Sequence, residues 1–287
     1  MEKMVVEKDK EKVRDIEVSK EYLVIGQGNT AEILQYEENK ILKLFREGMP
    51  YLTIFNEYQM ALQVQKVVSN VPKAFELVRF KNRYGIIYEK IQGKNMIEVL
   101  FEDLVHYKSY AKKLATIHAQ LHEKNTDITY TVKHKLIRDI DSVNELSPNE
   151  KMKVKNYLGT LDDQNKLCHF DFHPGNIMLR GDECIIIDWM TACAGNPCAD
   201  VARTLLLLKM GEMSHIHPCV QKALHLLMAR MGRVYKKEYM RLTQVTEEQI
   251  NSWMLPVAAA RLCEWLTDHE RKKLVQFVKE QLARLNL

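Results

Sequence analysis

The chain has 287 residues, of which 46% are hydrophobic and 28% are charged, and its formal net charge is +4. These values are typical of a soluble globular protein with one large or two smaller lobes, and no basic stripe predicts nucleic-acid binding. No apolar run approaches the ~18 residues of a membrane helix, and the N-terminus is too charged for a secretion signal. The six cysteines contain no Cys-x-x-Cys pair and indicate reduced thiols. We therefore expect a cytoplasmic protein without a membrane or nucleic-acid partner.

Three parts follow one another along the chain. Residues 1–20 carry six basic and six acidic side chains and little apolar content, which predicts a charged, loosely attached extension. Residues 21–90 have the pattern of about five antiparallel strands and one helix. Residues 91–287 are largely helical, with breaks expected near Gly232 and Pro256 among others.

A glycine turn joins the first two strands of this N-terminal part. Gly26 and Gly28 follow an apolar run, and a further apolar run begins after Thr30. A lone Gly-x-Gly is commonly just a hairpin. Ala31 replaces the third glycine of a dinucleotide-binding motif and no helix follows directly, so that motif is not predicted. Gly26, Gly28 and Thr30 are candidates for a turn that lies close over phosphate groups.

A charged pair is expected between the third strand and the helix after it. Residues 53–69 have the length and period of a helix, and Glu57 falls within its apolar stripe. A buried carboxylate costs several kcal/mol unless it is paired, and Lys43 is the candidate partner. Lys43 could instead be exposed, and Glu57 could reach water. The pair would match the lysine and glutamate that orient nucleotide phosphates in kinases.

The most informative stretch is Cys168 to Asp188. Two apolar runs, 177–179 and 185–187, flank a Gly-Asp turn and predict an antiparallel hairpin. Pairing would bring Asn176, before the first run, next to Asp188, after the second. Amide and carboxylate oxygens suit Mg²⁺, and Asp171 would stand within reach of the same phosphates as a base for a hydroxyl proton.

The string His169-x-Asp171-x-His173-Pro-Gly-Asn176 resembles the aminoglycoside phosphotransferase and choline kinase family, small-molecule kinases with a two-lobed, protein-kinase-like α+β fold. The resemblance implies Asp171 as catalytic base, Asn176 and Asp188 as Mg²⁺ ligands, and His169 as a catalytic-site residue that supports the loop. Phe170 stands where the family often has glycine. The implied cofactors are ATP, with GTP as an alternative, and Mg²⁺.

Further site residues follow from the same resemblance. The strand end before Gly93 is similar to the hinge that binds adenine through main-chain groups. The segment Gly195-Asn-Pro-Cys-Ala-Asp200 is similar to a family pattern in which the aspartate braces the catalytic loop. Further candidates for the nucleotide site are Glu89, Ile91, Met178 and Ile187. Candidates for the acceptor site are His173, Arg261, Glu264, Trp265 and Asp268.

Two alternatives stay open for the function. The first is a nucleotide-binding regulatory module of the same fold without turnover. The second is a protein kinase, which is disfavoured because only eleven residues separate Asp188 from Asp200 and leave no room for a long activation segment. The preferred prediction is transfer of the γ-phosphate of ATP to a hydroxyl of a small molecule, such as an amino alcohol, a sugar or an aminoglycoside. The identity of this acceptor and the oligomeric state are left open.

Two histidine pairs have spacings that metal sites use. His118 and His122 lie four residues apart on one predicted helix, and His215-x-His217 lies further along the chain. Because no third ligand accompanies them in sequence, we expect His118 and His122 to be a packed and a surface histidine.

Overall fold

The chain forms two compact units, which the computed structural model describes at residues 10, 13–16, 23–28, 30–211 and 218–287. The first unit contains Met1–Lys94 and Ile177–Met190, and the second contains Asn95–Asn176 and Thr191–Leu287. The sequence predicts lobes at 21–90 and 91–287, whereas the first unit extends to Lys94 and also includes Ile177–Met190. His215 and His217 lie outside the described residues.

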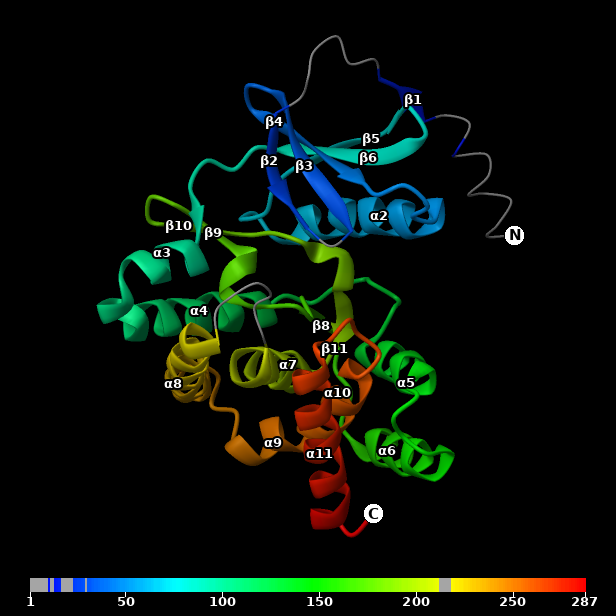
Figure 1. Cartoon of the computed structure of the whole chain (residues 1–287), viewed down its shortest axis with the longest axis vertical. Coiled ribbons are helices and arrows are strands. Elements are labelled where there is room, and N and C mark those ends of the chain that lie inside the picture. Colours follow the sequence, from blue (N-terminus) through cyan, green and yellow to red (C-terminus); the bar gives the residue numbers. More distant parts are fainter. Residues whose placement is uncertain (1–9, 11–12, 17–22, 29, 212–217) are drawn as a thin grey trace. The chain divides into compact units, whose positions relative to one another are not determined.

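The first unit is built on a six-stranded sheet (Figure 1). Its strands, in spatial order, are β1 (Arg14–Asp15), β5 (Ala74–Phe80), β6 (Arg83–Glu89), β4 (Lys40–Phe45), β3 (Ala31–Glu37) and β2 (Val24–Gln27). The pairs from β5 to β2 are antiparallel, as expected, whereas β1 pairs with β5 in parallel. The sheet is therefore mixed.

The described part of the N-terminal segment is not loosely attached, so that expectation is wrong for residues 13–16. Ile16 is buried in the sheet's core. The flanking charges are paired across the strands, Asp15 with Arg79 at 2.6 Å and Arg14 with Glu76 at 2.7 Å. The high content of charged residues led us to expect no strand in this segment. Two of these charged side chains, Arg14 and Asp15, have ion-pair partners on β5.

Helix α2 (Tyr51–Val67) lies along one face of this sheet (Figure 1). Its Ile54 packs with Phe45 and Ile86, whereas Leu42 and Leu44 belong to a separate apolar cluster. Because successive side chains of a strand point to opposite faces, Lys43 shares the α2 face with Phe45. The expected apolar stripe of this helix is confirmed, and Glu57 is buried within it.

The predicted hairpin is confirmed as β9 (Ile177–Arg180) and β10 (Glu183–Ile186). Its turn contains Gly181 at φ +60°. Asn70 anchors the hairpin within the first unit, because its Nδ2 donates to the carbonyl of Cys184 at 2.9 Å and its own carbonyl accepts from Ile186 at 2.9 Å.

The second unit is mainly helical. Its helices are α3 (Met96–Glu102), α4 (Tyr107–His122), α5 (Val132–Ser142), α6 (Pro148–Thr160), α7 (Pro197–Met210), α8 (Pro218–Thr243), α9 (Glu247–Ser252), α10 (Met254–Arg261) and α11 (Asp268–Arg284). Short 3-10 turns cover Leu104–His106, Pro174–Asn176 and Trp189–Thr191, the last of which crosses the unit boundary, and β7 (Lys94–Asn95) lies at the other boundary. Strands β8 (Lys166–Cys168) and β11 (Cys193–Gly195) pair antiparallel on either side of residues 169–192 in sequence. None of the helices in the described chain has the length and apolar character needed to cross a membrane.

One expected helix break, from Gly232 to Lys237, is wrong. Gly232 lies inside α8, where a Cβ would meet Leu208 of α7 at 3.5 Å, so this glycine lies at a contact between two helices. The break expected near Pro256 is confirmed, because α9 ends at Ser252 and α10 begins at Met254. Pro256 itself lies in the first turn of α10, where a missing N–H removes no intrahelical hydrogen bond.

Gly93 generates a prediction about stability. It has φ +131°, and a Cβ there would lie 2.0 Å from the carbonyl oxygen of Leu179 in β9. We expect Gly93→Ala to lower the free energy of unfolding by about 3 kcal/mol, because the backbone must move. Gly181→Ala is the matched control: it also has positive φ but meets no atom within 4 Å, so it should cost about 1 kcal/mol. Urea denaturation measures both, and equal losses would contradict the steric explanation.

Candidate active site

The expected ion pair between Lys43 and Glu57 is confirmed. Lys43 Nζ lies 2.7 Å from Glu57 Oε1, and it also lies 3.1 Å from Asp188 Oδ1. One lysine thus joins β4, α2 and the residue that ends the hairpin segment, all within the first unit. Asp188 has φ +63°, a left-handed conformation that is uncommon for residues other than glycine and occurs at functional sites.

Burial and charge act together on this triad. Burial raises the pKa of Glu57, although the positive charge of Lys43 opposes this effect. Burial alone would lower the pKa of Lys43, but the carboxylates of Asp188 and Glu57 outweigh it and raise that pKa. Lys43 therefore stays a cation next to the exposed carboxylate of Asp188.

The glycine turn is tied to its neighbours by main-chain bonds. The Gly28 N–H donates to the carbonyl of Ala31 at 2.9 Å, and the Arg46 N–H donates to the carbonyl of Thr30 at 2.9 Å. Neither Gly26 nor Gly28 has a positive φ. These two glycines carry no side chain that would cover the backbone. Neither adopts a backbone conformation that requires glycine.

The strand end near Gly93 includes main-chain groups without main-chain partners among the described residues. The Glu89 N–H donates to the carbonyl of Lys73 at 2.8 Å, and the Lys90 N–H donates to the carbonyl of Asn39 at 2.9 Å. Among the described residues, the N–H and C=O of Ile91 have no main-chain partner. Glu89 Oε1 lies 3.6 Å from Arg180 Nη1 on β9, and the side chains of Met178 and Ile187 are half-buried.

The catalytic-loop motif lies in the second unit, where Asn176 and Asp171 are in direct contact. Asn176 Nδ2 donates to the main-chain carbonyl of Asp171 at 2.9 Å and to its Oδ2 at 3.2 Å. With its amide nitrogen used in this way, Asn176 keeps Oδ1 for another partner. The register of the hairpin pairs Ile177 with Ile186, so the chain segments that carry Asn176 and Asp188 leave the hairpin at the same end.

Besides Asn176, two side chains lie close to the carboxylate of Asp171. Arg203 Nη2 donates to Oδ1 at 3.4 Å, and His173 Nε2 lies 3.6 Å from Oδ2. Burial by itself would raise the pKa of Asp171, but His173 and the charge of Arg203 outweigh it and hold the pKa below its usual range. The side chain keeps 28% exposure, so this carboxylate is ionised, oriented and able to meet a substrate.

Phe170 preserves the loop despite the absence of a glycine. It has φ +61°, the left-handed conformation that glycine adopts without steric cost. Its ring is fully buried, with the guanidinium of Arg203 5.6 Å from the ring centroid. Its carbonyl also accepts a hydrogen bond from Arg203 Nε. Packing around the ring therefore offsets the strain of about 1–2 kcal/mol that a non-glycine residue carries here.

Asp200, on α7, holds the main chain of the loop. Its Oδ2 accepts from the His169 N–H at 2.6 Å, and its Oδ1 accepts from the Phe170 N–H at 3.0 Å. His169 is fully buried, and its Nδ1 accepts from the Asp171 N–H at 3.2 Å. The contacts of Asp200 and His169 are thus those of a scaffold beneath Asp171.

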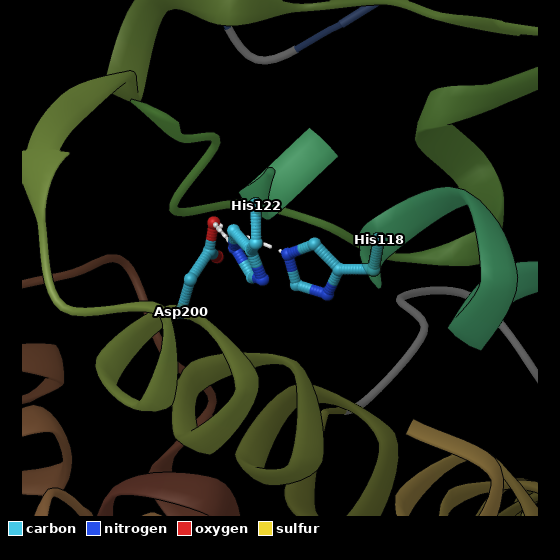
Figure 2. A group of neighbouring side chains, drawn as sticks. All are labelled: His118, His122 and Asp200. Carbon is cyan, nitrogen blue, oxygen red and sulfur yellow. Dashed lines mark hydrogen bonds and ion pairs between the residues drawn. The ribbon is translucent and has the colours of Figure 1, made fainter. Parts of the chain in front are cut away.

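Two histidines of α4 point toward the same carboxylate (Figure 2). His118 Nε2 lies 3.2 Å and His122 Nε2 lies 3.4 Å from Asp200 Oδ2. On their other side, His118 Nδ1 lies 2.6 Å from the Tyr235 hydroxyl and His122 Nδ1 lies 2.8 Å from the Tyr239 hydroxyl. His118 is packed as expected, but His122 is also buried, so the expectation of a surface histidine is wrong.

The three side chains are close enough to hold a metal ion, but hydrogen bonding accounts for their arrangement. A carboxylate oxygen accepts only, so the nitrogen that faces it carries the proton, and Nδ1 then accepts from the tyrosine hydroxyl. Burial lowers the pKa of His118 to about 3, which keeps this ring neutral. Both carboxylate oxygens of Asp200 also accept hydrogen bonds from main-chain N–H groups of the loop. We therefore assign the cluster to support of the loop.

The acceptor candidates differ in their placement. Glu264 Oε1 lies 2.5 Å from Arg203 Nη1. Because Arg203 also contacts Asp171, this arginine links the two carboxylates. Arg261 is buried and paired with Glu270, so the structure does not offer it to a substrate. Trp265 is 87% exposed, and Asp268 is an exposed residue in the first turn of α11, where a carboxylate is favourable.

Sequence reasoning missed Arg203 and the two tyrosines. Arg203 lies among mostly apolar residues of α7, three positions after Asp200 and therefore on the same helix face. That spacing could have revealed it. Tyr235 and Tyr239 are 117 residues from their histidine partners, and no local pattern signals such a contact.

His118 generates a prediction about pH. Its pKa is lowered to about 3 in the folded protein from 6.5, so the unfolded chain binds a proton that the folded protein does not. The free energy of unfolding should therefore fall as the pH decreases from 6.5 to 4.5, by up to about 1.4 kcal/mol per pH unit from this group. His118→Gln should show a shallower dependence in urea titrations at pH 6.5, 5.5 and 4.5. The same pH dependence of the free energy of unfolding in both proteins would contradict the role of His118.

Comparison with known proteins agrees with this geometry. A model of the phosphotransferase enzyme family matches residues 23–215, well over half of the chain. A search of curated proteins finds no match.

Solved structures share the fold at low sequence identity. Aminoglycoside-3'-phosphotransferase of type VIII is 16% identical, with a TM-score of 0.61 over 84% of this chain and 93% of its own. APH(2")-IIa, in a ternary complex with streptomycin and ATP, is 15% identical, with a TM-score of 0.58 over 91% of each chain. A choline/ethanolamine kinase family protein from Mesorhizobium loti is 11% identical, with a TM-score of 0.58 over 92% of this chain and 88% of its own.

The expected family, its kinase-like fold and its class of enzyme are thus confirmed. The chain belongs to the phosphotransferase enzyme family and is a small-molecule kinase.

Proposed function

We propose that this kinase transfers the γ-phosphate of ATP to a hydroxyl group of a small molecule, with Asp171 as the catalytic base. One observation carries the proposal: the carboxylate of Asp171 is oriented by Asn176 and Arg203 on a loop fastened to Asp200, and it remains partly exposed. Phosphoryl transfer asks mainly for positioning and charge stabilisation, so an ionised and fixed carboxylate fits the role.

The nucleotide is assigned to the first unit. Lys43, held by Glu57, supplies a fixed cation for phosphate oxygens. The unbonded main-chain groups of Ile91 are suited to the edge of an adenine ring, and the half-buried Met178 and Ile187 could cover its faces. Similar structures include an APH(2")-IIa complex with ATP and an ADP-bound APH(2'')-Ib, which supports ATP as the donor.

The donor set fits Mg²⁺. Asn176 Oδ1 and the exposed carboxylate of Asp188 are hard oxygen ligands, which this ion prefers. A bound Mg²⁺ would neutralise charge on the β- and γ-phosphate oxygens. Lys43 Nζ lies 3.1 Å from Asp188 Oδ1.

The residues of the loop act on the acceptor hydroxyl. Asp171 accepts a hydrogen bond from the hydroxyl, and its oxygen takes the proton as the oxygen–phosphorus bond forms and ADP leaves. Because the pKa of Asp171 is held low, this proton moves late, and orientation of the hydroxyl is the main contribution of the residue. Arg203 and Asn176 keep the carboxylate in place during this step.

The acceptor is proposed by class only. Similar structures include streptomycin and gentamicin complexes of APH(2")-IIa and a choline/ethanolamine kinase family protein, all of which point to hydroxyl compounds that carry amines. Glu264, which is partly exposed beside Arg203, is the acidic side chain best placed near Asp171 to meet such an amine. The five described cysteines form no disulfide with one another, which is consistent with the proposed cytoplasmic kinase.

The catalytic role of Asp171 is testable with a conservative change. Asp171→Asn should lower kcat by about 10²–10⁴-fold, because the amide keeps the shape but cannot take a proton. The control is Asp182→Asn, a change in the exposed hairpin turn, which should leave kcat unchanged. ATP consumption is measured with amino alcohols, sugars and aminoglycosides as acceptors. Equal rates for Asp171→Asn and the parent protein would favour the regulatory-module alternative.

The metal assignment predicts a separate defect. Asp188→Asn should raise the Mg²⁺ concentration needed for half-maximal activity by about tenfold or more, because one anionic oxygen ligand is lost. Glu183→Gln, on the exposed part of the same hairpin, is the control and should leave the Mg²⁺ dependence unaltered. A lower kcat with an unchanged Mg²⁺ dependence would contradict the metal assignment and would leave Asp188 only the role of holding Lys43.

A further inference from the structure

The second unit contains a pocket of about 650 Å³ that includes none of the catalytic-loop residues. It lies between α4, the start of α7, the end of α8 and α9. A volume of this size is within the range of small-molecule sites.

The pocket combines an apolar floor with charged groups. Trp253, Tyr239 and Pro197 are buried and form part of its lining. The exposed carboxylates of Glu123 and Asp162 also line it, and neither forms an ion pair with another described residue. Lys166 contributes an ammonium group, which donates to the main-chain carbonyl of Glu123 at 3.3 Å. A ligand with both charges and an apolar part would match these groups.

One wall of the pocket is connected to the catalytic loop. Tyr239 and His122 both line it. The Tyr239 hydroxyl bonds to His122 Nδ1 at 2.8 Å, and His122 Nε2 lies 3.4 Å from Asp200 Oδ2, the oxygen that accepts the His169 N–H. A chain of hydrogen bonds therefore runs from the pocket to the main chain beneath Asp171.

On the neighbouring side, Tyr235 bonds to His118 Nδ1, and His118 Nε2 lies 3.2 Å from the same oxygen of Asp200. Neither Tyr235 nor His118 lines the pocket. The fold thus contains two similar supports of Asp200, of which only one can be contacted by a ligand in this pocket.

We propose that the pocket is a regulatory site for an amphipathic zwitterion, namely an amino acid with an apolar side chain, and that its occupation steadies the catalytic loop through Tyr239, His122 and Asp200. The ammonium of the ligand pairs with Glu123 and Asp162, its carboxylate pairs with Lys166, and its side chain packs on Trp253. Contact with Tyr239 and His122 restricts both side chains, which lowers the cost of keeping Asp200 bonded to the loop.

Binding can be tested without nucleotide or acceptor, so the result does not depend on the proposed phosphotransfer. Calorimetry of the full chain with L-phenylalanine and L-leucine should detect binding. Phenethylamine, which lacks the carboxylate, and N-acetyl-L-phenylalanine, which lacks the positive charge, should bind at least about tenfold more weakly. Lys166→Gln and the double variant Glu123→Gln/Asp162→Asn should weaken L-phenylalanine to a similar degree. Absence of binding at 10 mM (about 3 kcal/mol), or equal affinity in these variants, would overturn the proposal.

Coupling to the loop is tested by amide hydrogen exchange of His169 and Phe170, whose N–H groups bond to Asp200. L-phenylalanine should slow this exchange by about fivefold. Tyr239→Phe should abolish the slowing, because the hydroxyl that reaches His122 is lost. The matched variant Tyr235→Phe, outside the pocket, should retain it. Binding without slower exchange, or the same slowing in Tyr239→Phe, would refute the coupling.

Discussion

The carboxylate of Asp200 is the fixed point of the second unit, because it accepts three hydrogen bonds and also lies 3.2 Å from His118 Nε2. The N–H groups of His169 and Phe170 reach it from the loop, and His118 and His122 reach it from α4. Although burial alone would raise the pKa of Asp200, the histidines hold it well below its usual range, so the charge persists inside the protein. A buried charge is tolerable only with such partners, and removing one of them would leave part of this charge unsatisfied.

Arg203 extends this scaffold to the reacting carboxylate. It lies one helical turn after Asp200 on α7, bonds to the Phe170 carbonyl, and contacts both Asp171 and Glu264. Its guanidinium also covers the ring of Phe170. The aromatic residue at a left-handed position and the buried arginine are therefore parts of one packing arrangement. This arrangement explains how the chain departs from the family's usual glycine and still keeps the loop conformation.

The candidate site residues are divided between the two units. The first unit holds Lys43 between Glu57 and Asp188, and the second holds Asp171 with Asn176. The main chain joins them directly, because Asn176 is followed by Ile177, the first residue of β9. The β9–β10 hairpin of the first unit thus begins directly after Asn176, the last residue of the His169–Asn176 segment of the second unit.

Local patterns determined much of this protein. The alternation of β4 and the helical stripe of α2 placed Lys43 and Glu57 on facing surfaces, and the Gly-Asp turn between two apolar runs defined the β9–β10 hairpin. These features depend on neighbouring residues, whose periodicity is visible in the sequence. The tertiary structure alone decided that residues 13–16 add a parallel strand, that His122 is buried against Tyr239, and that α8 continues through Gly232. Each of these depends on a partner far away in sequence, where burial and hydrogen bonding outweigh local preference.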